Sequence, residues 1–185
     1  MLAGLANKRL VAGLRAAGVD AVGLAALDGG VVDAARHADA ALGAVGSIER
    51  VDPALLETML AQGRVPVLAS IGHAGGALLN LNADDLAAAV ARALHARALL
   101  LLSDVPGVML DGALASELTA EARARRSPAT RCRAACGPSS RRRARRSQAG
   151  VRRVHVAAWQ GPATLRALLE GATIGTALVA EAVAR

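Results

Sequence analysis

The stretch RVDPALLETMLAQGRVPVLASIG, residues 50–72, decides the fold. Asp52 can cap a helix, and Pro53 suits the first helical turn, where the missing N–H would have no partner anyway. Gly63 ends the helix, and residues 65–72 are apolar enough for a strand buried on both faces of a parallel sheet. The expected buried face of the helix comprises Leu55, Leu56, Met59 and Leu60.

The same alternation of helix and strand extends along the chain in both directions. Residues 5–17 have helical periodicity, with Gly18 as the C-terminal cap, and residues 19–30 indicate a strand and a turn. The apolar face of this first helix comprises Leu5, Leu10, Val11 and Leu14. Downstream we expect helices at 82–96 and 161–171, and strands at 97–104, 151–159 and 173–179. Such alternation predicts βαβ units with helices on both faces of a parallel sheet.

The composition indicates a globular protein with a core of small aliphatic side chains. Hydrophobic residues make up 54% of the 185 residues, with one Trp and no Phe or Tyr. No apolar run reaches the ~18–20 residues that a membrane span requires. The apolar segment at the start is also too short for a signal peptide, so we expect a cytoplasmic protein.

Two strand exits carry polar residues that could bind a ligand, because ligands of parallel sheets bind beyond the carboxyl ends of the strands. In GGALLNLNADD, residues 75–85, Asn80, Asn82 and Asp84 alternate where a loop enters a helix. They could face one anionic ligand together, or Asn82 could simply cap the helix. In LLLLSDVPGV, residues 99–108, an acid and a Pro-Gly turn follow a buried strand.

Together these stretches resemble the acetylglutamate kinases of the amino acid kinase family. AGLANK at residues 3–8 opens the resemblance, and its most specific part is Asn-x-Asn-Ala-Asp at 80–84 followed by SDVPGV at 103–108. The similarity covers nearly the whole chain outside residues 122–149. Acetylaminoadipate kinases of lysine biosynthesis are the relatives most easily confused with this group.

The resemblance implies an α/β fold, a three-layer αβα sandwich with a mainly parallel sheet, in a single partial domain over residues 1–185. It also implies an enzyme of arginine biosynthesis that moves the γ-phosphoryl group of ATP, with Mg²⁺ carried by the nucleotide, to the side-chain carboxylate of N-acetyl-L-glutamate. A homo-oligomer is expected, with no membrane partner. Asn80 would bind the amino-acid substrate, and Asp84 would orient the catalytic lysines. The nucleotide site would be lined by Asp104, Val105, Pro106, Gly107, Val108 and Met109.

The lysines of that family are not matched. Lys8 is the only lysine of the chain, and we expect its side chain to be solvated on a helix. The family's first strand and glycine-rich loop have no counterpart either, so the domain is expected to be incomplete at its N-terminus. The chain by itself is therefore expected to be inactive, and a non-catalytic remnant is the alternative function.

The Arg-rich segment 122–149 departs from the rest of the chain. It lacks Leu, Val, Ile and Met, and ten of the 22 basic residues lie within 121–150, which explains most of the net charge of +7. We interpret it as an out-of-frame, disordered segment, with a nucleic-acid-binding arm as the less favoured alternative. Cys132 and Cys136 supply too few ligands for a metal site, so free thiols are expected.

Overall fold

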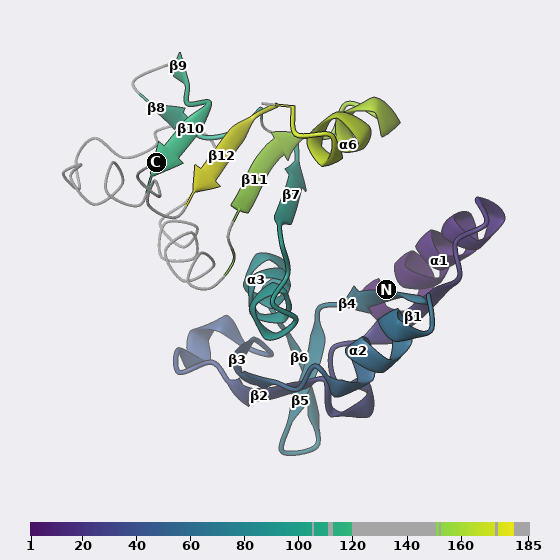
Figure 1. The fold of residues 1–185 in the computed structure, drawn as a ribbon. Coiled ribbons are helices and arrows are strands. Elements are labelled where there is room, and N and C mark those ends of the chain that lie inside the picture. Colours follow the sequence, from purple (N-terminus) through teal and green to yellow (C-terminus); the bar gives the residue numbers. More distant parts are fainter. Residues whose placement is uncertain (105, 111–112, 120–150, 152, 173, 180–185) are drawn as a thin grey trace. The chain divides into compact units, whose positions relative to one another are not determined.

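The computed structural model describes residues 1–104, 106–110, 113–119, 151, 153–172 and 174–179 (Figure 1). The chain divides into two compact units, Met1–Leu94 and His95–Arg185. The Arg-rich segment, with its cysteines and the hypotheses attached to it, lies outside the described residues. Within the described ranges, no helix combines the length and apolarity that a membrane crossing requires.

The predicted helix and strand of residues 50–72 lie in unit 1 as α2 (Ala54–Ala61) and β4 (Val65–Ala69). The Asp52 carboxylate accepts the Ala54 N–H at 3.0 Å, although the helix begins one residue later than expected. Leu56 and Met59 are buried, whereas Leu60 is 46% exposed. β4 pairs in parallel with β1 (Ala21–Ala25) and ends at Ala69, earlier than the expected strand of residues 65–72. The expectation of burial on both faces is wrong, since Val65 is 41% exposed, residues 66–68 are half-buried and only Ala69 of this strand is buried.

Two antiparallel hairpins complete unit 1. β2 (Val32–Arg36) pairs with β3 (Gly46–Val51), and β5 (Ile71–Ala74) pairs with β6 (Ala77–Asn80). The short helices η2 (Asp28–Gly30) and η3 (Ala40–Leu42) lie in the connections, and α3 (Ala83–Ala93) ends the unit. The buried cluster joins the β2–β3 hairpin to α2, α3 and the residue after β6, and it comprises Ala26, Val31, Val32, Leu56, Leu81 and Leu86.

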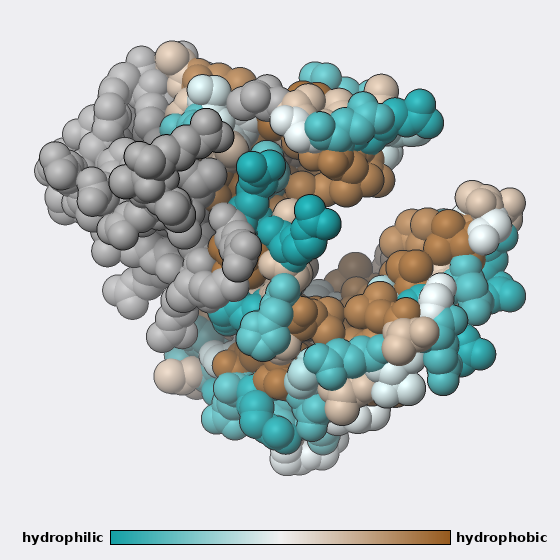
Figure 2. Space-filling view, viewed as in Figure 1, coloured by the Kyte–Doolittle hydropathy of each residue, from teal (hydrophilic) through white to brown (hydrophobic). Residues whose placement is uncertain are grey.

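The first helical segment differs from the expectation in its buried face. It consists of a π-helical turn, η1 (Leu2–Ala6), and α1 (Asn7–Ala16), and it ends before Gly18, whose φ is +82°. Apolar residues gather along one side of α1 (Figure 2), but Leu5 and Leu10 are 54% and 55% exposed. The buried residue of α1 is instead polar. Asn7 is 5% exposed, and its Nδ2 donates to the carbonyl oxygens of Val67 at 2.8 Å and Leu24 at 3.4 Å.

We expect Asn7→Ala to lower the free energy of unfolding by about 1–3 kcal/mol, because two carbonyl groups of β1 and β4 lose a buried donor. Lys8→Ala is the matched control. The Lys8 ammonium also donates to a strand carbonyl, that of Gly23 at 2.9 Å, but its side chain is exposed. Urea unfolding of both variants measures the difference, and equal losses of stability would contradict the role given to Asn7.

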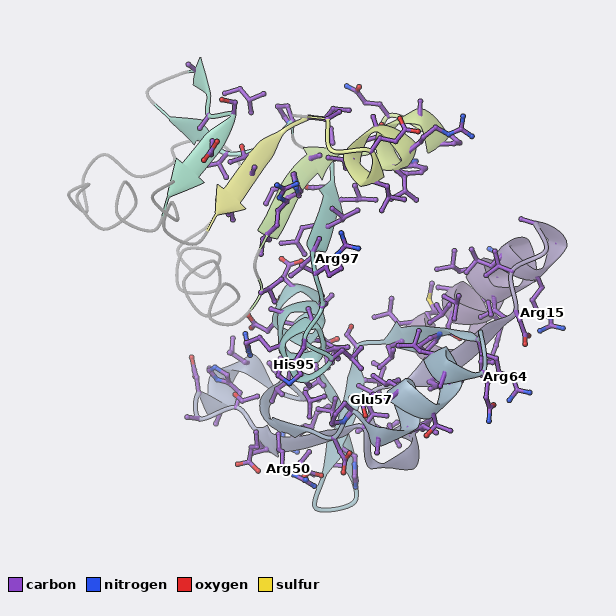
Figure 3. The ribbon with its side chains drawn as sticks, viewed as in Figure 1. Arg15, Arg50, Glu57, Arg64, His95 and Arg97 are labelled. Carbon is purple, nitrogen blue, oxygen red and sulfur yellow. The ribbon has the colours of Figure 1, made fainter. Side chains whose placement is uncertain are left out.

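Exposed ion pairs connect the approaches to the two parallel strands. Arg15 and Arg64, labelled in Figure 3, reach the Asp20 carboxylate at 2.7 and 3.4 Å. Asp20 lies just before β1, and Arg64 lies just before β4. All three side chains are at least half exposed, so each pair contributes less than about 1 kcal/mol.

Unit 2 is built on a sheet with the strand order β10-β12-β11-β7. β7 (Leu99–Ser103) and β11 (Arg153–Ala158) pair in parallel, as the sequence predicts. β12 (Thr176–Val179) follows α6 (Pro162–Leu169) and pairs antiparallel with β11, which differs from the expected βαβ unit. β12 also pairs in parallel with β10 (Glu117–Thr119). A short hairpin of β8 (Met109–Leu110) and β9 (Ala113–Leu114) lies between β7 and β10 in the chain.

Candidate functional site

The first group of predicted site residues lies in unit 1, where β6 leads into α3. Asn80 ends β6 with an exposed side chain, between Leu79 and Leu81, which are each 1% exposed. The Asn80 backbone N–H donates to the Ala44 carbonyl at 2.8 Å, which holds the residue against the loop before β3. The two leucines anchor this segment in the core and thereby turn the Asn80 amide towards solvent.

Asn82 is the N-cap of α3, and its Oδ1 accepts the Asp85 N–H at 3.0 Å. The capping interpretation of Asn82 is therefore confirmed. The extended alternation stops there, because α3 begins at Ala83 and Asp84 lies in its first turn. Asp84 is exposed, and its negative charge is stabilised near the helix N-terminus. Asn80 and Asp84 thus flank the capped start of α3, while the Asn82 oxygen serves the helix itself.

The second group lies in unit 2, beyond the end of β7. Asp104 is exposed, and the Ser103 hydroxyl donates to its Oδ1 at 3.1 Å. Val105 lies outside the described residues, Pro106 is exposed, and Met109 begins β8. Gly107 has a φ of +149°, a conformation that side chains rarely adopt. β7 is less buried than expected, since Leu102 is 42% exposed.

The exit of β11 lies beside the exit of β7. Ala158 is opposite Ser103 in the parallel ladder, and the Trp159 N–H donates to the Ser103 carbonyl at 2.9 Å. Trp159 is 51% exposed. Because the carboxyl ends of neighbouring parallel strands form the usual ligand-binding edge of such a sheet, the Asp104 turn lies in a suitable place for a ligand.

One buried histidine lies in the same ladder. His155 on β11 is 6% exposed, opposite Leu100 of β7 and Ala177 of β12. Burial lowers the pKa of His155 below its ordinary value, and the charge of Arg153 lowers the pKa further. His155 thus lies within the buried sheet that supports the turn.

Thr176 is the residue of this region that sequence reasoning missed. It is fully buried at the start of β12, and its Oγ1 accepts the Val108 N–H at 2.8 Å and donates to the Ala115 carbonyl at 2.6 Å. Its partners lie more than 60 positions earlier in the chain. A threonine in an apolar strand shows no local signal of such a contact.

Comparison with known proteins found one family model and several individual proteins that are similar to this chain. The model of the amino acid kinase family matches residues 2–122. The acetylglutamate kinase of Methanopyrus kandleri is 48% identical over 118 residues, which are 60% of this chain and 48% of that protein. That of Geobacillus kaustophilus is 44% identical over 122 residues, or 65% of this chain and 47% of that protein. The chain spans about half the length of the curated relatives it matches.

Solved structures agree in fold. A Streptococcus mutans protein is similar with a TM-score of 0.76 and 29% identity, covering 97% of this chain and 69% of that chain. The N-acetylglutamate synthase of Neisseria gonorrhoeae, solved with coenzyme A and N-acetyl-glutamate, has a TM-score of 0.75 and 26% identity, covering 95% of this chain and 41% of that chain. The predicted fold class is thereby confirmed.

Proposed function

Because this chain belongs to the amino acid kinase family, we propose that it forms part of a kinase that transfers the γ-phosphoryl group of ATP to the side-chain carboxylate of N-acetyl-L-glutamate. The names of the curated relatives support this substrate. The observation that carries the proposal is the exposure of Asn80 and Asp84 on either side of the capped start of α3. The protein would act in arginine biosynthesis, in the cytoplasm, as a homo-oligomer.

In this proposal the two groups of residues have separate roles. Asn80 presents an exposed amide, which can donate to a substrate carboxylate and accept from an N–H group. Asp84 would orient, through its charge, the catalytic lysines of the complete kinase, since the one lysine of this chain is Lys8. Asp104 and residues 105–109 bind ATP at the turn that follows β7.

The nucleotide is expected to bring Mg²⁺ with it. Mg²⁺ prefers oxygen ligands and usually takes one or two carboxylates together with substrate phosphates. The Asp104 carboxylate, exposed at the β7 exit, is of the right kind. Over the described ranges, no group of three His, Cys, Asp or Glu side chains could hold a metal ion.

Phosphoryl transfer to a carboxylate requires that the two substrates be positioned and their negative charges neutralised. A carboxylate nucleophile, the γ-phosphoryl group and the leaving ADP are all anionic, so catalysis depends on holding them in line among cations and N–H groups. When bound, Mg²⁺ neutralises phosphate charge. The residues of this chain bind the two substrates at their ends, and none of them forms a covalent bond to the phosphoryl group.

Binding measurements with the purified chain test the proposal. Calorimetric titration with the magnesium complex of the ATP analogue AMPPNP and with N-acetyl-L-glutamate should give two independent sites. Asn80→Ala should weaken N-acetyl-L-glutamate binding about tenfold or more, the loss of one hydrogen bond to a charged group, and leave AMPPNP binding unchanged. Asp104→Ala should do the reverse.

Glu57→Gln is the matched control, because this side chain on α2 is exposed and lies outside both groups (Figure 3). It should change neither affinity. Tighter binding of N-acetyl-L-2-aminoadipate than of N-acetyl-L-glutamate would retain a kinase and reject the substrate. Failure to bind the nucleotide and both amino-acid derivatives would reject the proposed function.

A further inference from the structure

We propose that Thr176 is a positioning residue for nucleotide binding, because its buried hydroxyl fixes the backbone of the turn that follows β7. The inference rests on the proposed function in one respect, namely that this turn contacts ATP. The hydrogen bonds that carry it belong wholly to unit 2.

The hydroxyl of Thr176 joins both sides of the β8–β9 hairpin at its base. Val108 precedes the hairpin and donates its N–H to Oγ1, and Ala115 follows the hairpin and accepts the hydroxyl hydrogen. These two residues are also bonded directly, since the Ala115 N–H donates to the Val108 carbonyl at 3.0 Å. One side chain therefore satisfies two backbone groups and fixes where the chain enters and leaves the hairpin.

The surroundings of the hydroxyl leave little room for movement. A Cβ atom at Gly107 would lie 2.7 Å from Thr176 Oγ1 and 3.1 Å from the Thr176 backbone nitrogen. The first distance is shorter than real Cβ atoms essentially ever show, and the second is tighter than most real Cβ contacts. The turn therefore approaches β12 as closely as a glycine permits. Thr176 itself has no exposed surface. The turn and the strand are thus held by both packing and hydrogen bonds.

The consequence for a nucleotide follows from the nature of its recognition. Phosphates are bound by backbone N–H groups and nearby side chains whose positions are set before the ligand arrives. Thr176 is buried and would not touch ATP. Its effect on affinity would therefore pass through the position of residues 106–108, which gives it a measurable signature different from that of a residue in direct contact.

Thr176→Val removes the hydroxyl at nearly constant volume, and Thr176→Ser retains it. In Thr176→Val, hydrogen exchange of the Val108 amide should accelerate more than that of the β7 and β11 amides. AMPPNP affinity should fall about tenfold, equivalent to ~1.4 kcal/mol. Thr176→Ser should keep both the exchange rate at Val108 and the AMPPNP affinity of the unsubstituted chain. If Thr176→Val does not fold, Thr176→Ala replaces it, because it removes the hydroxyl without adding a methyl group. Hydrogen exchange at Val108 and AMPPNP affinity are measured in the same way.

Thr164→Val is the matched control. Thr164 is also buried, at 5% exposure, and its hydroxyl accepts a backbone N–H, that of Gln160 at 3.2 Å. Thr164→Val should lower the melting temperature without changing exchange at Val108 or AMPPNP affinity. This result would distinguish an effect on the position of the turn from a general loss of stability.

Unchanged AMPPNP affinity in folded Thr176→Val or Thr176→Ala, with binding by the unsubstituted chain intact, would overturn the inference and leave the proposed function standing. Equal losses of affinity in Thr164→Val and Thr176→Val would also overturn it, because they would indicate a general loss of stability. If the unsubstituted chain binds no nucleotide, the proposed function fails and this inference fails with it, whatever the exchange rate at Val108.

Discussion

No ADP release above background is expected when the 185-residue chain is incubated alone with Mg·ATP and N-acetyl-L-glutamate. Phosphoryl transfer to a carboxylate needs cations at the developing charge, and the loss of one such preorganised group typically costs about 10²–10³ in kcat. The one lysine of the chain is Lys8, and its ammonium already donates to the Gly23 carbonyl at 2.9 Å. Asp84 therefore has no second lysine in this chain to orient.

A coupled assay for ADP, with a full-length acetylglutamate kinase as the positive control, measures this result. The same preparation should still bind AMPPNP, so that binding and turnover are separated. Turnover by the purified chain that disappears in Asp84→Ala would contradict the prediction, since it would mean that other groups supply the missing positive charge.

The second large effect is expected from Gly175→Ala. Gly175 has a φ of +74°, and a Cβ atom there would collide with the Val156 carbonyl oxygen and lie 2.8 Å from the Cα of Ala157. Backbone atoms of β11 cannot yield as a flexible side chain would. Left-handed strain and overpacking together should lower the free energy of unfolding by about 3–5 kcal/mol, a large part of a domain's stability.

Gly171→Ala provides the comparison, because Gly171 also has a positive φ, +91°, but a Cβ atom added there would have no other atom within 4 Å. It should cost only about 1–2 kcal/mol, the left-handed strain alone. Urea unfolding followed by fluorescence reports on unit 2 directly, because Trp159 is the single tryptophan. Similar losses in the two variants would show that the close contact with β11 is not the cause.

Local signals were sufficient for the elements that have caps and clear periodicity. Gly63, with a φ of +75°, ends α2 as expected, and the side chain of Asn82 caps α3. The parallel pairing of β7 with β11 also agrees with the prediction, as does the presence of polar residues at the β7 exit. At these two helix ends, the residues that determine the structure lie within one turn of it, whereas the pairing of β7 with β11 follows from the alternation of elements along the chain.

The features that the sequence analysis predicted wrongly depend on contacts between residues far apart in the chain. Periodicity of apolar residues favoured Leu5 and Leu10 as buried, whereas a polar residue, Asn7, is buried because two strand carbonyls require its donor. The predicted parallel direction of β12 is wrong, because a helix can return the chain in either sense and β12 pairs antiparallel with β11. Of the predicted site residues, Asn80, Asp84 and Asp104 are exposed at the expected places, and their roles remain predictions.

The bond between Thr176 and Val108 also has a consequence for the order of events during synthesis. The chain leaves the ribosome from its N-terminus, and Val108 emerges 68 residues before the threonine that binds it. Until then the turn after β7 lacks its partner strand, β11 lacks β12, and only unit 1 has all of its described pairings available. Domains generally fold N-terminal first at ~5–20 residues per second, so the nascent chain would complete unit 1 seconds before the nucleotide turn acquires its final form. A newly made molecule would thus be folded around its proposed amino-acid site before it could hold ATP.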